Sequence, residues 1–290
     1  MRLSIEHLTT YRYDELARHS TQYVRLTPKS SARQHVLDWQ LDMPAAPLVS
    51  TDGFGNVLHV LTLDEPHRSI SIRAHGEVEV LDEDREDDDD GLSPLVHSRF
   101  TRLTRPSAAL TEFAHQYAVQ PGLAGMEKLM AEVLAHMPYT PGSTHAGSTA
   151  GEAFALGQGV CQDHTHVFLA CARLTGRPAR YVSGYLYSQD DHHVASHAWA
   201  EVWLDGIWHT FDITNQQCQP RNHLKLAVGM DYLDACPVRG VRYGGGPESL
   251  HAVATVERLA SEHTTDDVLR RHAPGTGHDF CGGFPHQCRR

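Results

Sequence analysis

Long apolar runs, clustered basic charge and an apolar leader segment are all missing from this sequence. No stretch approaches the roughly 20 apolar residues that a membrane-spanning helix needs, and the start of the chain lacks the apolar segment of a secretory signal. Basic residues number 25 against 36 acidic ones, whereas nucleic-acid binding depends on clustered Lys and Arg. We therefore expect a cytoplasmic protein that binds neither membranes nor nucleic acids.

Cysteine is scarce, and the apolar fraction of 40 % is ordinary for a globular protein. A chain of 290 residues can bury its own core without disulfides, so we expect reduced thiols. We expect Cys171 to be a buried thiol, and Cys218 and Cys236 to lie in loops without chemistry. Histidine is abundant, with 22 residues, so a single histidine is weak evidence for a site.

Composition and periodicity divide the chain into four regions. Residues 1–82 contain short alternating stretches separated by turn signals, which predicts an N-terminal antiparallel β-sandwich-like domain. An acidic linker follows at 83–93, and it overlaps a run at 82–90 in which eight of nine residues are acidic. We expect this run to be a solvated loop. Residues 94–260 are expected to form the second domain, and 261–290 a polar C-terminal extension.

The second domain mixes helical and strand-like patterns. Apolar residues at helical spacing from Met126 to Met137 predict a helix with one buried face, and residues 106–117 and 161–174 also have helical patterns. The residues at 141–151 have the composition of a loop. Strand-like segments follow at 179–187, 197–204, 207–213, 224–228 and 253–259. This pattern predicts an α+β protein.

Cys161 stands out because it follows a Gly-Xaa-Gly loop and begins a predicted helix. The first turn of a helix supplies unpaired N–H groups and a partial positive charge, and both favour a thiolate over a thiol. Gly157 and Gly159 allow a tight turn and leave room for a substrate carbonyl. A small buried residue at a helix start is the structural alternative.

His197 and Asp212 are predicted to pair across a β-hairpin. Asp205-Gly206 between two apolar runs indicates a two-residue turn, with Leu204 and Ile207 as the closing pair. Asp212 then lies opposite Trp199 and diagonal to His197, within side-chain reach. A carboxylate in that position fixes the tautomer of the histidine and stabilises its imidazolium.

Together these residues supply a nucleophile, a base and an orienting carboxylate. The oxyanion of an acyl intermediate would bind the Cys161 backbone N–H, with Tyr139 or the Gln158 side chain as candidate second donors. Trp199, on the same face as the pair, and Gly159 are candidates for contact with substrate.

Four motifs carry a resemblance to a known family: GVCQD at 159–163, PARYVSGY at 178–185, SHAWAE at 196–201 and FDITN at 211–215. They resemble the bacterial transglutaminase-like superfamily. The same subgroup is also indicated by the β-rich N-terminal region and by the segments at 227–232 and 238–241. The resemblance spans roughly residues 1–260. The sequence departs from the family at Ile213, where proline is frequent, and at one position of 164–166, where a bulky apolar residue is expected. The extension at 261–290 has no match in the family.

The resemblance implies a papain-like core behind an N-terminal β-domain. It also implies a catalytic triad of Cys161, His197 and Asp212 that acts without a cofactor. The family includes transglutaminases, cysteine proteases and other amidases, so it does not fix the acyl acceptor. We expect a cysteine enzyme that acts on an amide of a peptide or protein substrate, with hydrolysis favoured over cross-linking.

Two alternatives remain open from the sequence. The fold could serve as a non-catalytic module that binds a peptide in the same cleft. A metal could instead bind the acidic and histidine residues at 190–193 with His197, or the tail residues His278, Cys281, His286 and Cys288. The tail spacing is not that of a zinc finger, and His197 already has a role, so we expect no metal.

Overall fold

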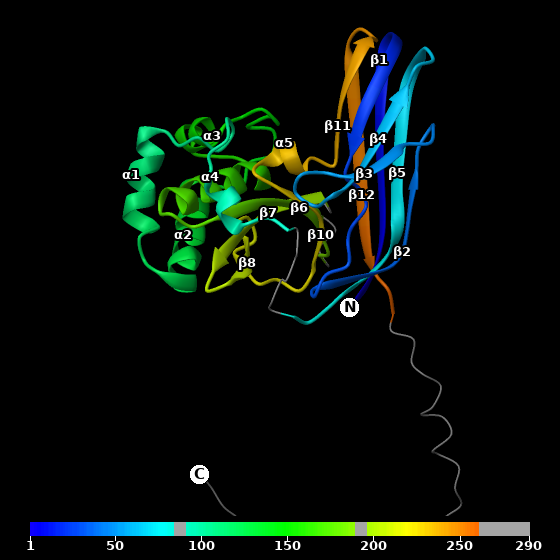
Figure 1. The fold of residues 1–290 in the computed structure, drawn as a ribbon. Coiled ribbons are helices and arrows are strands. Elements are labelled where there is room, and N and C mark those ends of the chain that lie inside the picture. The colour runs from blue at the N-terminus through cyan, green and yellow to red at the C-terminus, as the bar shows by residue number, and fades with distance from the viewer. Residues whose placement is uncertain (84–90, 189–195, 261–290) are drawn as a thin grey trace, which may run out of the picture. The chain divides into compact units, whose positions relative to one another are not determined.

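The computed structural model describes residues 1–83, 91–188 and 196–260, and the statements below refer to these residues. They form two antiparallel sheets and a group of helices (Figure 1). The first sheet has seven strands in the order β2-β5-β1-β4-β3, with β11 and β12 also paired to β1, and the second has the order β10-β6-β7-β8-β9. The predicted α+β class is confirmed.

The first sheet is organised around one long strand. β1 alternates buried and exposed side chains over much of its length, which places Leu3, Ile5 and Tyr11 on the covered face. Hydrogen bonding joins all seven strands in one sheet, and the covered face packs against Tyr185 and Leu224 of the second sheet rather than against a second N-terminal sheet. The strands are β1 (Arg2–Val24), β2 (Gln34–Asp42), β3 (Leu48–Thr51), β4 (Val57–Leu63), β5 (His67–Val80), β11 (Val238–Gly244) and β12 (Glu248–Arg258).

The last two strands correct the expected extent of the second domain, which was 94–260. β12 pairs with β1 from Leu3 to Tyr13, and β11 pairs with it from Ala17 to Val24. The physical reason is that β1 has a long second edge whose N–H and C=O groups need partners. Residues 238–258 therefore belong to the first sheet.

The second sheet carries the helices on one side (Figure 1). Its central helix α4 packs on β6 and β7 and is surrounded by α1, α2 and α3, and the apolar stripe from Met126 to Met137 is buried against it as predicted. The strands are β6 (Ala179–Leu186), β7 (Ser196–Leu204), β8 (Ile207–Asp212), β9 (Gln217–Cys218) and β10 (His223–Gly229). The helices are η1 (Pro94–Ser98), α1 (Ala108–Tyr117), α2 (Gly122–His136), α3 (Ala150–Leu156), α4 (Cys161–Leu174) and α5 (Tyr232–Ala235).

Some of the sequence predictions lie outside the described residues. These are most of the acidic run, residues 190–193 and the tail from 261, with its histidines and cysteines. In the part of the chain that is described, no helix is both long and apolar enough to cross a membrane.

Candidate functional site

Cys161 is the first residue of α4, as the sequence predicted. The loop before it is fixed by Asp163, whose Oδ2 accepts hydrogen bonds from the Val160 N–H at 2.9 Å and the Thr144 hydroxyl at 2.6 Å. As the first helical residue, Cys161 has a backbone N–H without an acceptor inside the helix. Its side chain is partly exposed, so a substrate can reach the sulfur at the positive end of the helix dipole.

Gly159 has a different role from the one expected. A Cβ at this position would lie 2.7 Å from Cβ of Asp163 and 2.9 Å from its Oδ2. The missing side chain therefore makes room for the capping carboxylate rather than for a substrate carbonyl. Gly159 acts on the site by letting Asp163 hold the loop that ends at Cys161.

The hairpin places His197 and Asp212 as its register predicted. Leu204 pairs with Ile207, and Asp205 and Gly206 form the turn with φ angles of 51° and 86°. His197 Nε2 lies 2.8 Å from Asp212 Oδ2, and both side chains are buried. A diagonal pair across two strands thus becomes a direct hydrogen bond.

Asp212 collects hydrogen bonds from three other side chains and one backbone group. Its Oδ2 accepts from His197, from His223 at 2.8 Å and from the Asn215 amide at 2.7 Å, while Oδ1 accepts from the Asn215 backbone N–H at 3.1 Å. Burial alone would raise the pKa of Asp212, but the hydrogen bonds from the two histidines outweigh it and hold that pKa well below its ordinary value. The carboxylate is therefore charged at neutral pH.

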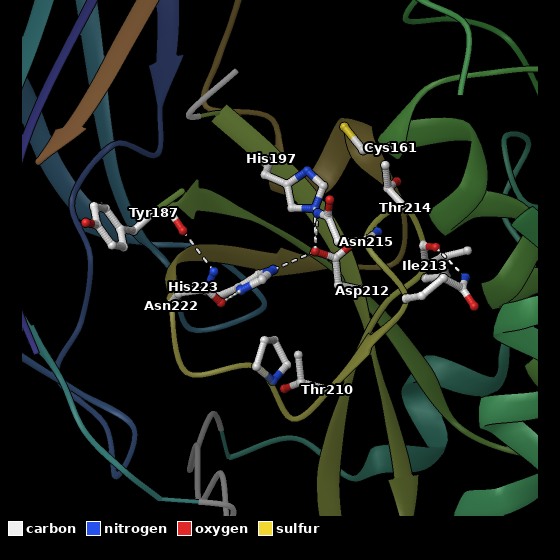
Figure 2. A network of polar contacts seen from close by, with 12 residues as sticks. Cys161, Tyr187, His197, Thr210, Asp212, Ile213, Thr214, Asn215, Asn222 and His223 are labelled. Carbon is white, nitrogen blue, oxygen red and sulfur yellow. Dashed lines mark hydrogen bonds and ion pairs between the residues drawn. The ribbon is translucent and has the colours of Figure 1, made fainter. Parts of the chain in front are cut away.

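The charge of Asp212 acts on His197. Burial lowers the pKa of the imidazole, but hydrogen bonds to Asp212 and Cys161 outweigh it and raise that pKa to about 10. Because Nε2 contacts Asp212, Nδ1 is the ring nitrogen left for the sulfur, and Figure 2 shows Cys161 beside the His197 ring on the side away from Asp212. An imidazolium at neutral pH can pair with a thiolate at this position.

Two histidines of α4 connect the cysteine helix to its surroundings. His164 lies 2.8 Å from the Met137 carbonyl oxygen through Nε2 and 2.9 Å from the Thr214 hydroxyl through Nδ1. His166 accepts the Tyr232 backbone N–H at 3.1 Å. An apolar residue was expected at one of these positions. Hydrogen bonds at both ring nitrogens make His164 compatible with burial, and they tie α4 to the segment that follows Asp212.

The two candidate oxyanion donors differ in their surroundings. Tyr139 pairs with Gly159 in a short parallel bridge, and burial and the nearby Cys161 charge raise the pKa of its hydroxyl. It thus remains protonated as a donor near the sulfur. Gln158 is partly buried in the loop between α3 and α4, with no side-chain hydrogen bond to another described residue. The oxyanion roles of both residues stay predictions.

Trp199 does not offer a face to substrate. Its side chain is only 2 % exposed, and its ring meets the His223 ring edge to face at a centroid distance of 4.9 Å. Val182 and Val228 pack against it in the same cluster. The expectation that Trp199 contacts substrate is therefore wrong, because its ring is buried and packs against His223.

The other cysteines in the described part of the chain form no disulfide. Cys171 is buried in α4 as predicted, and burial raises its pKa. Cys236 is buried after α5 with a raised pKa, while Cys218 lies in the short strand β9 rather than in a loop. These surroundings favour neutral thiols at Cys171 and Cys236.

His223, Asn215 and Asn222 are the polar residues of the site that the sequence analysis missed. His223 begins β10 and joins the network through Asp212, and Asn222 continues it to Tyr187 (Figure 2). The motif ending in Asn215 was noted only as a family feature. His223 is one of 22 histidines, so its residue type gave no signal. Its proximity to Asp212 depends on a strand order that local spacing does not reveal.

Among the described residues, His197, Asp212 and His223 are the group of side chains chemically suited to hold a metal ion, with their ligand atoms within 4.8 Å of one another. Both ring nitrogens, however, lie 2.8 Å from the same carboxylate oxygen, which is the separation of a hydrogen bond. A metal would have to displace both protons and separate these atoms. Hydrogen bonding accounts for the arrangement without a cation.

The fold is papain-like, and the comparisons with known proteins identify its family. Residues 3–79 match the bacterial transglutaminase-like N-terminal region, and residues 111–213 match the transglutaminase-like superfamily. The chain belongs to the transglutaminase-like superfamily.

Relatives extend over nearly the whole chain. An uncharacterized protein of Mycobacterium leprae is 31 % identical over 287 residues, covering 89 % of this chain and 99 % of the relative. An uncharacterized protein of Mycobacterium tuberculosis is 29 % identical over 283 residues, which cover 86 % of this chain and 90 % of the relative. A solved structure from Cytophaga hutchinsonii, named a "Putative Cysteine Protease", has a TM-score of 0.73 at 21 % identity over 91 % of this chain and 92 % of that one. This last likeness is one of fold.

Proposed function

We propose that the protein is a cysteine-dependent amide-bond hydrolase or acyltransferase that works through a thioester on Cys161. His197 would serve as acid and base, and Asp212 would orient it. The observation that carries the proposal is the buried 2.8 Å contact between His197 Nε2 and Asp212 Oδ2, with the hydrogen bond to Cys161 that helps raise the pKa of His197. An imidazolium held in this way stabilises a thiolate nucleophile.

The reaction would begin with attack of the Cys161 thiolate on the carbonyl carbon of an amide. The oxyanion that forms would accept a hydrogen bond from the Cys161 backbone N–H, with the Tyr139 hydroxyl as the candidate second donor. Collapse of this intermediate breaks the C–N bond, and His197 gives its proton to the departing amine. The products of this half-reaction are a free amine and an acyl thioester.

The second half-reaction removes the acyl group. Neutral His197 takes a proton from water, whose oxygen attacks the thioester carbonyl and releases a carboxylic acid and the thiolate. An amine in place of water would give transfer. Hydrolysis is favoured because water greatly exceeds any amine, and transfer needs a site that excludes water. A pocket of about 680 Å³, lined by Leu186 and Tyr187 as well as by Asn215, Gln217 and Asn222, adjoins the Asp212 network. The proposed substrate is a peptide or protein that bears an amide, and the proposed cytoplasmic location rests on composition alone.

The test is to trap the acyl group on the protein. The full chain is incubated with a peptide library, quenched in acid and analysed by mass spectrometry for an adduct on Cys161. Cys161→Ala and His197→Ala should each lower amide turnover at least about 1,000-fold while circular dichroism stays unchanged. Cys171→Ala, in the same helix, is the matched control and should retain turnover. Full activity of either site variant contradicts the mechanism.

A second measurement needs no substrate. At about pH 5 an ordinary thiol is almost fully protonated and reacts slowly with iodoacetamide. Rapid labelling of Cys161 alone supports an activated thiolate. Slow and uniform labelling of all cysteines would favour a binding module instead of an enzyme.

A further inference from the structure

Asp212 has a second imidazole on the oxygen that contacts His197. His223 Nε2 lies 2.8 Å from Asp212 Oδ2, and the His223 side chain is buried at the start of β10. The mechanism above gives this residue no task. A buried histidine that shares one carboxylate oxygen with the proposed base is placed to act on that base.

The other side of the His223 ring fixes where its protons lie. Its Nδ1 is 3.0 Å from Asn222 Oδ1, and the Asn222 amide nitrogen donates to the Tyr187 carbonyl oxygen at 2.8 Å (Figure 2). That second bond orients the amide, so its oxygen faces the histidine. Both ring nitrogens therefore face oxygen acceptors. His223 donates to Asp212 as the Nε2–H tautomer, and a second proton on Nδ1 would satisfy Asn222 as well.

We propose that His223 is a positioning residue that donates its Nε2–H to Asp212, keeping this carboxylate charged and aimed at His197. The inference rests on the proposed function, because it concerns the same cysteine and histidine. Asp212 is fully buried, and a buried carboxylate stays charged only while donors surround it. Loss of one donor would let the carboxyl group take up a proton at a higher pH. His197 would then be held less firmly by this carboxylate, and its imidazolium would stabilise the Cys161 thiolate less.

Charged and titratable groups from several elements surround this pair. Cys161 and His164 approach from α4, His197 from β7, and Arg33 from the segment before β2. The Arg33 guanidinium donates to the Thr210 hydroxyl at 2.8 Å. Substitution of His223 leaves the chemistry of all these groups unchanged, so the donor to Asp212 is the polar group that is removed.

A packing role for His223 is the structural alternative, because its ring meets Trp199 edge to face. Two substitutions separate the roles. His223→Phe keeps an aromatic ring for Trp199 but removes the donor. His223→Gln removes the ring but keeps an N–H group that can reach a carboxylate. His7→Phe, at a buried histidine of the first sheet that contacts Tyr185, is the matched control.

The measurement is the rate of Cys161 alkylation by iodoacetamide between about pH 4 and 8, followed by mass spectrometry of the full-length protein. A hydrogen bond to a charged group corresponds to about a 10-fold effect or one pKa unit. We expect His223→Phe to shift the acid limb of the profile upward by about one pH unit. Near pH 5 it should then react about 10-fold more slowly. His223→Gln should stay within about 3-fold of the wild type, and His7→Phe should leave the profile unchanged.

The inference is overturned if His223→Phe has an unshifted profile while His223→Gln is labelled slowly, because this result assigns His223 to packing. Identical profiles for all variants overturn it as well. Both results leave rapid labelling of wild-type Cys161 intact. Failure of the proposed function is distinguishable from these outcomes, because the wild-type Cys161 itself would then react no faster than the other cysteines.

Discussion

Asp212 is the residue on which the hydrogen bonds of the site converge. Its two oxygens accept from His197, His223 and both the side chain and the backbone of Asn215. The raised pKa of His197, about 10, depends on this charge as well as on Cys161. A histidine whose pKa is raised on folding adds stability below its ordinary pKa and loses it as pH rises through the folded value. The pairing should therefore stabilise the fold at neutral pH and weaken toward pH 10.

Asp212→Asn tests this dependence directly. An amide has no charge to stabilise the imidazolium and favours the wrong tautomer, so the pKa of His197 should fall toward its ordinary range. Amide turnover should drop at least about 100-fold, and the ultraviolet absorbance of the Cys161 thiolate should be lost at neutral pH. Asp64→Asn, which changes an exposed carboxylate paired with His19, is the control and should alter neither. An unchanged thiolate signal in Asp212→Asn would assign the stabilisation to the helix terminus alone.

At the scale of elements, local spacing predicted the cysteine helix and the hairpin. The Asp205-Gly206 turn fixed the register, so the contact between His197 and Asp212 followed from counting residues. The loop-like composition before Cys161 did not predict α3, although Thr149 and Glu152 form a capping box that signals a helix start. His223 could not be placed in this way. Its strand β10 pairs with β6, where His223 lies opposite Leu186, 37 positions earlier in the chain. That pairing brings His223 near Asp212.

Gly184 in β6 allows this part of the sheet to pack. A Cβ there would lie 2.1 Å from the Leu224 carbonyl oxygen and 2.5 Å from the Trp199 ring. Gly184→Ala should therefore lower the free energy of unfolding by about 1–3 kcal/mol, because the backbone of β10 must move. It should also slow Cys161 alkylation, since Trp199 packs on His223. Gly53→Ala, where a Cβ would meet nothing within 4 Å, is the control. Denaturant unfolding measures both variants, and equal midpoints would show that the sheet absorbs the methyl group without cost.

At the scale of the whole molecule, the two sheets depend on each other. Tyr185, Leu224 and Leu226 of the second sheet belong to the core of the first, and Asn56 bonds the Val228 backbone through both its amide atoms. The sequence predicted two successive domains because composition changes near the acidic run. It could not reveal that β11 and β12 return to β1, since that pairing joins residues more than 200 positions apart.

Truncation tests this return of the chain. A protein that ends at residue 237 lacks β11 and β12, which leaves the β1 edge from Leu3 to Val24 without the partners it has in the structure. An unpaired edge of this length costs hydrogen bonds and favours aggregation, so the shortened protein should be poorly soluble or unfold at a much lower denaturant concentration. A protein that ends at residue 260 keeps every strand pairing described here and should unfold like the full chain. Similar unfolding midpoints for the two truncated proteins would mean that the second domain is stable without the returning strands, as the sequence alone had suggested.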